Sequence, residues 1–173
     1  DSLYGIAVSE AKIGLEKESY QNFLTALRLN SNDADILSDF GVSLFGFGKF
    51  QEAAAYLRRA IAADNENAEA KLYLGKALLT MGNIAETLAL LKESEKKRPD
   101  DPDICYNLAI AYGKSADSGL SHYYFARYFK MKGKVESALF HFKKALNELP
   151  SGGGKFAETK KEIDSLKNRA KKE

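Results

Sequence analysis

The chain has 173 residues, of which 45% are hydrophobic, and this length suits one compact domain or one repeat array. Its single cysteine, Cys105, excludes an internal disulfide and a cysteine-based metal site, and no run of about 18 apolar residues predicts stable membrane insertion. The net charge of +2 combines an acidic N-terminal part with a basic C-terminal part, which indicates a dipolar surface that orients a partner or docks onto a neighbouring domain. No RNA-binding or zinc-finger motif points to nucleic acid.

The chain begins at Asp1 rather than Met, so we expect a fragment of a longer protein. From there, small residues recur at a spacing of 34 in two series that share one register. A period of this length predicts helical hairpins, in which one series ends the first helix and the other lets two helices approach closely. The two series are Gly14, Gly48 and Gly82, and Ala7, Gly41 and Gly75. The predicted repeats are 1–33, 34–67, 68–101 and 102–132.

The register changes in the fourth repeat. Ala116 occupies the turn position, and the next turn glycine, Gly133, follows Gly82 by 51 residues, which is one and a half periods. One helix at about 119–131 is therefore expected to close one hairpin and open the next, and an extra helix follows at 134–148. An array over 1–150, a Gly-rich linker at 151–154 and a capping helix at 155–173 complete the prediction. The expected fold class is all-α, with about ten helices in a right-handed superhelix that has a concave side.

The 34-residue pattern resembles the tetratricopeptide repeat (TPR) family over 1–150, and residues 34–67, ADILSDFGVSLFGFGKFQEAAAYLRRAIAADNEN, follow the family pattern throughout. Residues 109–150, AIAYGKSADSGLSHYYFARYFKMKGKVESALFHFKKALNELP, also resemble the TPR domain of bacterial periplasmic zinc metalloproteases of the beta-barrel assembly-enhancing type. That resemblance implies an N-terminal protease domain, a periplasmic or cell-envelope location and a role in outer-membrane protein quality control. The alternatives are a free-standing scaffold for complex assembly, which leaves a cytoplasmic location open, and a domain that regulates access to an enzyme's active site.

The TPR pattern implies a concave groove that binds a peptide or an unfolded polypeptide. The alternative is that some of its residues pack within the hairpins or against the protein's own protease domain. In TPR co-chaperones, basic and amide side chains grip a C-terminal carboxylate; the matching positions here hold Tyr4, Val8, Asp39, Glu69 and Tyr73, so we expect no such clamp. The predicted groove residues are Tyr4, Val8, Ala11, Ser38, Val42, Phe45, Leu72, Lys76, Leu79, Tyr106, Asn107, Ile110 and Lys114.

Aromatic residues cluster between 123 and 142. Tyr123 and Tyr124 are the candidates for an outer docking patch, and the alternative is a core shared by three helices. The two histidines, His122 and His141, lack further ligands at metal-binding spacing, and neither belongs to an HExxH motif. We therefore predict no catalytic residue, no metal and no cofactor in this chain.

Overall fold

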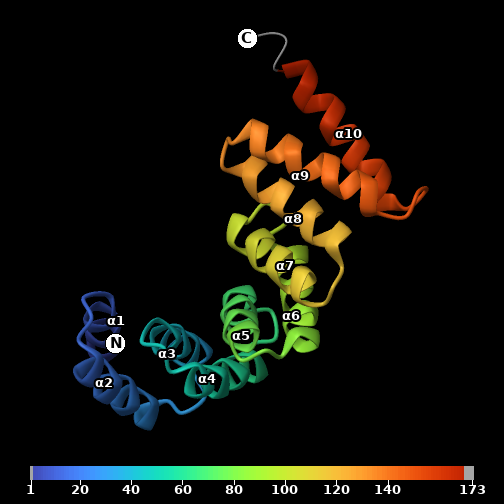
Figure 1. Ribbon diagram of the computed structural model, residues 1–173. Coiled ribbons are helices and arrows are strands. Elements are labelled where there is room, and N and C mark those ends of the chain that lie inside the picture. The colour runs from blue at the N-terminus through green and yellow to red at the C-terminus, as the bar shows by residue number, and fades with distance from the viewer. Residues whose placement is uncertain (1, 170–173) are drawn as a thin grey trace. The chain divides into compact units, whose positions relative to one another are not determined.

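The computed structural model describes residues 2–169. Within this range it contains ten helices and no strand, as the 34-residue period predicts (Figure 1). The helices are α1 (Ser2–Lys12), α2 (Glu16–Leu29), α3 (Ala34–Gly46), α4 (Phe50–Ala63), α5 (Ala68–Thr80), α6 (Ile84–Lys97), α7 (Pro102–Lys114), α8 (Ser118–Met131), α9 (Val135–Glu148) and α10 (Gly154–Arg169). They belong to two compact units, residues 1–94 and 95–173.

The turns inside the hairpins depend on one residue with positive φ. Gly14, Gly48 and Gly82 have φ values of 83°, 75° and 83°, as the first glycine series predicts. After each of them the chain returns a backbone hydrogen bond to the preceding helix; the amide of Lys49, for example, donates to the carbonyl of Leu44 at 2.9 Å. Such an arrangement satisfies carbonyl groups that the end of a helix leaves open. The glycines therefore fix where each first helix ends.

The first unit is built from stacked hairpins. α1 packs on α2 and α3 packs on α4, while the first helices α1, α3 and α5 lie in sequence beside one another. Its core is centred on Phe23 and Phe40, whose rings stack at 4.9 Å, and on the fully buried Leu57. Because α1, α3 and α5 are neighbours, side chains from equivalent positions of these helices share one face of the unit.

A hydrogen bond recurs between the two helices of a hairpin. Hydroxyl groups on the second helix donate to the carbonyl of the small residue on the first helix: Ser19 to Ala7 at 2.9 Å, Thr87 to Gly75 at 3.2 Å and Ser121 to Ala109 at 2.8 Å. The small residue thus leaves room for a buried hydroxyl as well as for the neighbouring helix. The bond ties the hairpin together where both helices are buried.

In the second unit α8 packs against both α7 and α9, which agrees with the half-period change in register. Ala116 has a φ of 62° in the turn between α7 and α8, and Gly133 has a φ of 70° in the turn between α8 and α9. α10 packs on α9 and begins at Gly154, the last residue of the predicted linker. Residues 170–173 of the predicted capping helix lie outside the described residues, and the boundaries of array, linker and cap stay a prediction.

Candidate functional site

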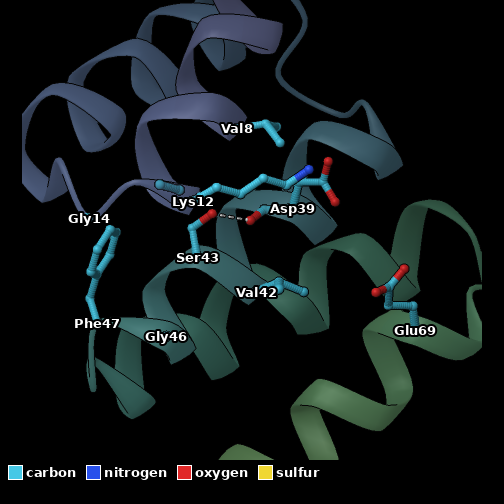
Figure 2. A pocket seen from close by; sticks show the side chains of 10 residues that line it. Val8, Lys12, Gly14, Asp39, Val42, Ser43, Gly46, Phe47 and Glu69 are labelled. Carbon is cyan, nitrogen blue, oxygen red and sulfur yellow. Dashed lines mark hydrogen bonds between the residues drawn. The ribbon is translucent and has the colours of Figure 1, made fainter.

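The candidate site is an open depression in the first unit, with a volume of about 680 Å³ (Figure 2). It lies over α1, α3 and the beginning of α5 and includes the turns that follow α1 and α3. Both its apolar wall and its ends are therefore set by the first helices of successive repeats. The lining residues are Val8, Ala11, Lys12, Gly14, Asp39, Val42, Ser43, Gly46, Phe47 and Glu69.

The apolar wall consists of Val8 and Ala11 from α1 and Val42 from α3. Val8 and Ala11 are three residues apart and share one helix face, and Val42 occupies the position of Val8 one period later. All three are partly buried and pack against the core of the unit. They present fixed apolar surface to the depression while their other atoms are held by the core.

Two carboxylates line the depression. The Tyr4 hydroxyl donates a hydrogen bond to Asp39 Oδ2 at 2.5 Å, so the Asp39 side chain is held in place by α1. Burial of the phenol and this hydrogen bond raise the pKa of Tyr4 well above its usual range. Glu69, in the first turn of α5, is exposed, and Lys12 is the one cation among the lining residues. Figure 2 shows both carboxylates away from the end formed by Gly14 and Phe47.

The structure brings part of the predicted groove together. Val8, Ala11 and Val42 line the depression, and Tyr4 supports it through Asp39. Sequence reasoning placed Asp39 and Glu69 only as obstacles to a carboxylate clamp. It missed Lys12, Ser43, Gly46 and Phe47, although Gly46 and Phe47 lie directly before the turn glycine Gly48 and could have been found from that position.

Phe45 and Lys76 form a separate contact in the first unit. The Phe45 ring packs against Phe50 at 5.4 Å and against Tyr73 at 5.6 Å. Lys76 Nζ lies 4.6 Å from the centre of the Tyr73 ring and 5.5 Å from that of Phe45. Such cation–π contacts hold the lysine along an aromatic surface. Neither Phe45 nor Lys76 lines the depression, so their role in a groove stays a prediction.

Three predicted groove positions in the first unit are buried instead. Ser38, Leu72 and Leu79 are 4%, 3% and 7% exposed. A side chain with so little accessible surface cannot supply much contact to a ligand, so these three groove assignments are wrong. They lie on first helices of their repeats, as predicted, but their side chains pack against neighbouring residues. This agrees with the alternative that some predicted groove residues pack within the hairpins.

The four predicted residues of α7 lie in the second unit. Tyr106 is 41% exposed and packs edge-on against Phe125 at 6.0 Å, Ile110 is half-buried and Lys114 is exposed. Asn107 is buried and its amide donates to the carbonyl of Asp103 at 2.8 Å, so its assignment as a groove contact is wrong. The contribution of the other three residues to ligand binding stays a prediction.

Tyr123 and Tyr124 do not form an exposed patch. They are 0% and 3% exposed and belong to the core of the second unit, so the docking-patch assignment is wrong. The Tyr124 ring stacks on Tyr112 at 5.4 Å, and its hydroxyl donates to Glu95 Oε2 at 3.0 Å. Burial and the neighbouring Glu95 raise the pKa of Tyr124. Because α8 serves two hairpins, it has more than one buried face, and both tyrosines lie on these faces.

The two histidines meet between α8 and α9. His122 Nδ1 lies 2.9 Å from His141 Nδ1, and the His141 ring stacks on Phe129 at 5.3 Å. Partial burial, and then the neighbouring His122, lower the pKa of His141. Over residues 2–169, no group of three or more His, Cys, Asp or Glu side chains is arranged to hold a metal ion. Within the same range, no helix is long and apolar enough to cross a membrane.

A family model described as tetratricopeptide repeat matches residues 44–104, which run from the end of α3 through α4, α5 and α6 into α7. The match covers this segment alone and shows that residues 44–104 are similar to tetratricopeptide repeats. TPR repeats bind protein or peptide partners. No curated protein matches the chain. The solved structures therefore supply the comparison for the remaining helices.

Solved structures share the TPR fold over most of the chain. Residues 41 to the end of MamA from Desulfovibrio magneticus are 17% identical, with 97% of this chain and 95% of that chain covered and a TM-score of 0.73. YrrB, described as a TPR protein with an unusual peptide-binding site, is 22% identical over 82% and 73% of the chains, with a TM-score of 0.70. PilW, a type IV pilus biogenesis factor, is 21% identical over 94% and 76%, with a TM-score of 0.68. At these identities the likeness shows the fold alone.

Proposed function

We propose that the chain is a protein-interaction module that holds a polypeptide segment of a partner in the depression over α1, α3 and α5. The observation that carries this proposal is the joint presence of a fixed apolar wall, Val8, Ala11 and Val42, and an open volume of about 680 Å³. This volume is in the range of ligand sites and is open enough for a chain to enter from solvent. The peptide-binding site named for YrrB, which has the same fold, supports the proposal.

A helical glycine at the edge of the depression allows a direct test. A Cβ atom added at Gly46 would meet nothing within 4 Å, so Gly46→Gln extends a neutral side chain into the depression without disturbing α3. Gly5 in α1 has the same free space and does not line the depression, which makes Gly5→Gln the matched control. Both variants gain helix propensity, so a difference between them reports on the site rather than on stability.

The probe is a fluorescein-labelled, acetyl- and amide-capped heptapeptide, Gly-Leu-Gln-Gly-Leu-Gln-Gly, and the readout is fluorescence anisotropy. We expect saturable binding to the chain, a dissociation constant raised about threefold or more in Gly46→Gln, and no change in Gly5→Gln. Equal binding by the two variants would place the peptide elsewhere. The proposed function would be overturned if the unaltered chain showed no saturable binding to this probe or to the two peptides in which Lys or Glu replaces both Gln residues.

The resemblance of residues 109–150 to periplasmic zinc metalloproteases supports a finer proposal. In it, the module presents polypeptides to a protease domain of the same protein in the cell envelope, and that domain is a second partner. A free-standing TPR scaffold is equally consistent with the fold and the comparisons. The complete gene distinguishes the two: an upstream HExxH domain supports the attached protease, and a complete gene without one supports the scaffold.

A further inference from the structure

The depression has a charge pattern as well as an apolar wall. Asp39 and Glu69 line it, against the single cation Lys12, so its lining carries one more negative than positive charge. The carboxylates come from different helices, α3 and α5, and both lie away from the turn end marked by Gly14 and Phe47 (Figure 2). Figure 2 also shows the Lys12 side chain extending toward Asp39, so Glu69 supplies the negative charge that lies apart from this cation at that end of the site.

The two carboxylates differ in how they are held. Asp39 accepts the Tyr4 hydroxyl on Oδ2, so its position is fixed before a ligand arrives. The Glu69 carboxylate is exposed, and among residues 2–169 it has no hydrogen bond or ion pair. A group without a partner in the free protein can pair with a ligand without first breaking a contact. Glu69 is thus the side chain from which an incoming cation gains most.

We propose that this depression selects polypeptide segments in which a lysine or arginine lies next to apolar residues, with Glu69 and the pre-positioned Asp39 receiving the cation and Val8, Ala11 and Val42 receiving the apolar side chains. This inference rests on the proposed function and names the chemistry of its ligand. A ligand carboxylate would instead meet two like charges against the single cation Lys12, so acidic segments and free C-terminal carboxylates are disfavoured.

The test uses three capped heptapeptides, Gly-Leu-Xaa-Gly-Leu-Xaa-Gly, in which Xaa is Lys, Gln or Glu. With the whole chain at low ionic strength, we expect the Lys peptide to bind about threefold or more tighter than the Gln peptide, and the Glu peptide to bind more weakly than both. The advantage of the Lys peptide decreases as salt is added, because screening weakens exposed charge pairs. Blocked termini ensure that only Xaa carries charge.

Matched charge variants assign the preference to the site. Glu69→Gln is expected to remove most of the difference between the Lys and Gln peptides. Glu18→Gln removes the same charge from the exposed first turn of α2, away from the lining, and is expected to leave the difference unchanged. Thermal unfolding of both variants checks that neither change alters the fold.

The outcomes separate the two proposals. Equal affinity for all three peptides, with sensitivity to Gly46→Gln, overturns the charge preference and leaves the binding module intact. A Lys preference that Glu18→Gln reduces as much as Glu69→Gln attributes it to overall charge and also overturns this inference. Absence of binding by all three peptides removes the proposed function itself.

Discussion

At the scale of single residues, the distance between the two helices of a hairpin depends on the size of the residue at their point of closest approach. A Cβ atom at Gly41 would lie 2.5 Å from Leu57 Cγ and 3.3 Å from the carbonyl oxygen of Ala53. At Gly75 the nearest atom, Leu91 Cδ2, would be 3.0 Å away. Leu57 is fully buried and cannot move aside freely. The close approach in the second repeat therefore requires glycine.

Gly41→Ala should lower the free energy of unfolding by about 1–3 kcal/mol, because the methyl group overpacks the contact with Leu57. Gly5→Ala, at a position with open space, should instead raise it by about 0.5–1 kcal/mol through helix propensity. Urea denaturation followed by far-UV circular dichroism measures both. A stabilising effect at Gly41 would show that α3 and α4 are less closely packed than described.

Ala116 is the one non-glycine residue with positive φ among residues 2–169. An L-residue pays a steric penalty in this conformation that glycine avoids, and Ala116 is exposed, so Ala116→Gly loses no packing. We expect the free energy of unfolding to rise by about 1 kcal/mol. Ala55→Gly, on the exposed face of α4, should lower it by about 1 kcal/mol. A decrease in both variants would contradict the strain at Ala116.

At the scale of helices, α10 is joined to α8 by polar contacts. The buried Tyr123 hydroxyl donates to Glu158 Oε1 at 2.5 Å and accepts from Lys155 Nζ at 2.9 Å, and Lys130 pairs with Glu162 at 2.7 Å. Burial would raise the pKa of Glu158, but the hydrogen bonds from Tyr123 and Lys155 lower it overall. α10 is thus held by specific polar side chains as well as by its buried apolar residues Ile163 and Leu166.

Tyr123→Phe keeps the buried ring and removes only the hydroxyl. We expect a loss of about 1–3 kcal/mol in the free energy of unfolding, because Glu158 and Lys155 lose a shared partner. Tyr128→Phe removes a hydroxyl from a half-buried ring that packs against Tyr106 and Phe129 and lies under Lys132, and should change stability by less than about 0.5 kcal/mol. Urea denaturation compares the two, and equal losses would argue against the contact between α8 and α10.

The histidine pair gives α8 and α9 a pH dependence. The pKa of His141 is lower in the folded chain than its ordinary value of about 6.5. At a pH between the folded and the unfolded pKa, the unfolded chain therefore binds more protons than the folded chain. Stability should therefore be full above about pH 6.5 and decrease as the pH falls below it. Urea denaturation from about pH 7.5 to about pH 5.5 should show this slope, and His141→Gln should reduce it. An unchanged slope in His141→Gln would assign it to other groups.

At the scale of the whole molecule, the chain consists of two compact units, 1–94 and 95–173. Contacts in repeat arrays are made mainly between neighbouring elements, so a local defect is expected to stay local. Gly41→Ala should accelerate hydrogen exchange in α3 and α4, where Gly41 and Leu57 meet, and leave amides of α9 and α10 unchanged. Hydrogen–deuterium exchange with mass spectrometry measures this, and uniform acceleration would show that the chain unfolds as one cooperative unit.

The sequence predicted the helices better than the site. Turn glycines such as Gly48 determine where helices end through local backbone geometry, so their spacing was sufficient. The same register selected Val8 and Val42, which line the depression, but it also included Leu72, which is buried. Register identifies a helix face, whereas exposure depends on the neighbour that covers it. The paired hydroxyls were missed because Ala53 interrupts their series in the second repeat.

The use of α8 by two hairpins has a consequence for transferring knowledge between relatives. Each TPR hairpin consists of a first and a second helix. The turn residues Ala116 and Gly133 are 17 positions apart, which is half a period, so α8 is the second helix of one hairpin and the first helix of the next. An alignment that continues in steps of 34 beyond residue 116 would compare positions in the second helix of one hairpin with positions in the first helix of another. Ligand contacts mapped from other TPR structures onto α9 must therefore be shifted by 17 residues before any substitution is chosen.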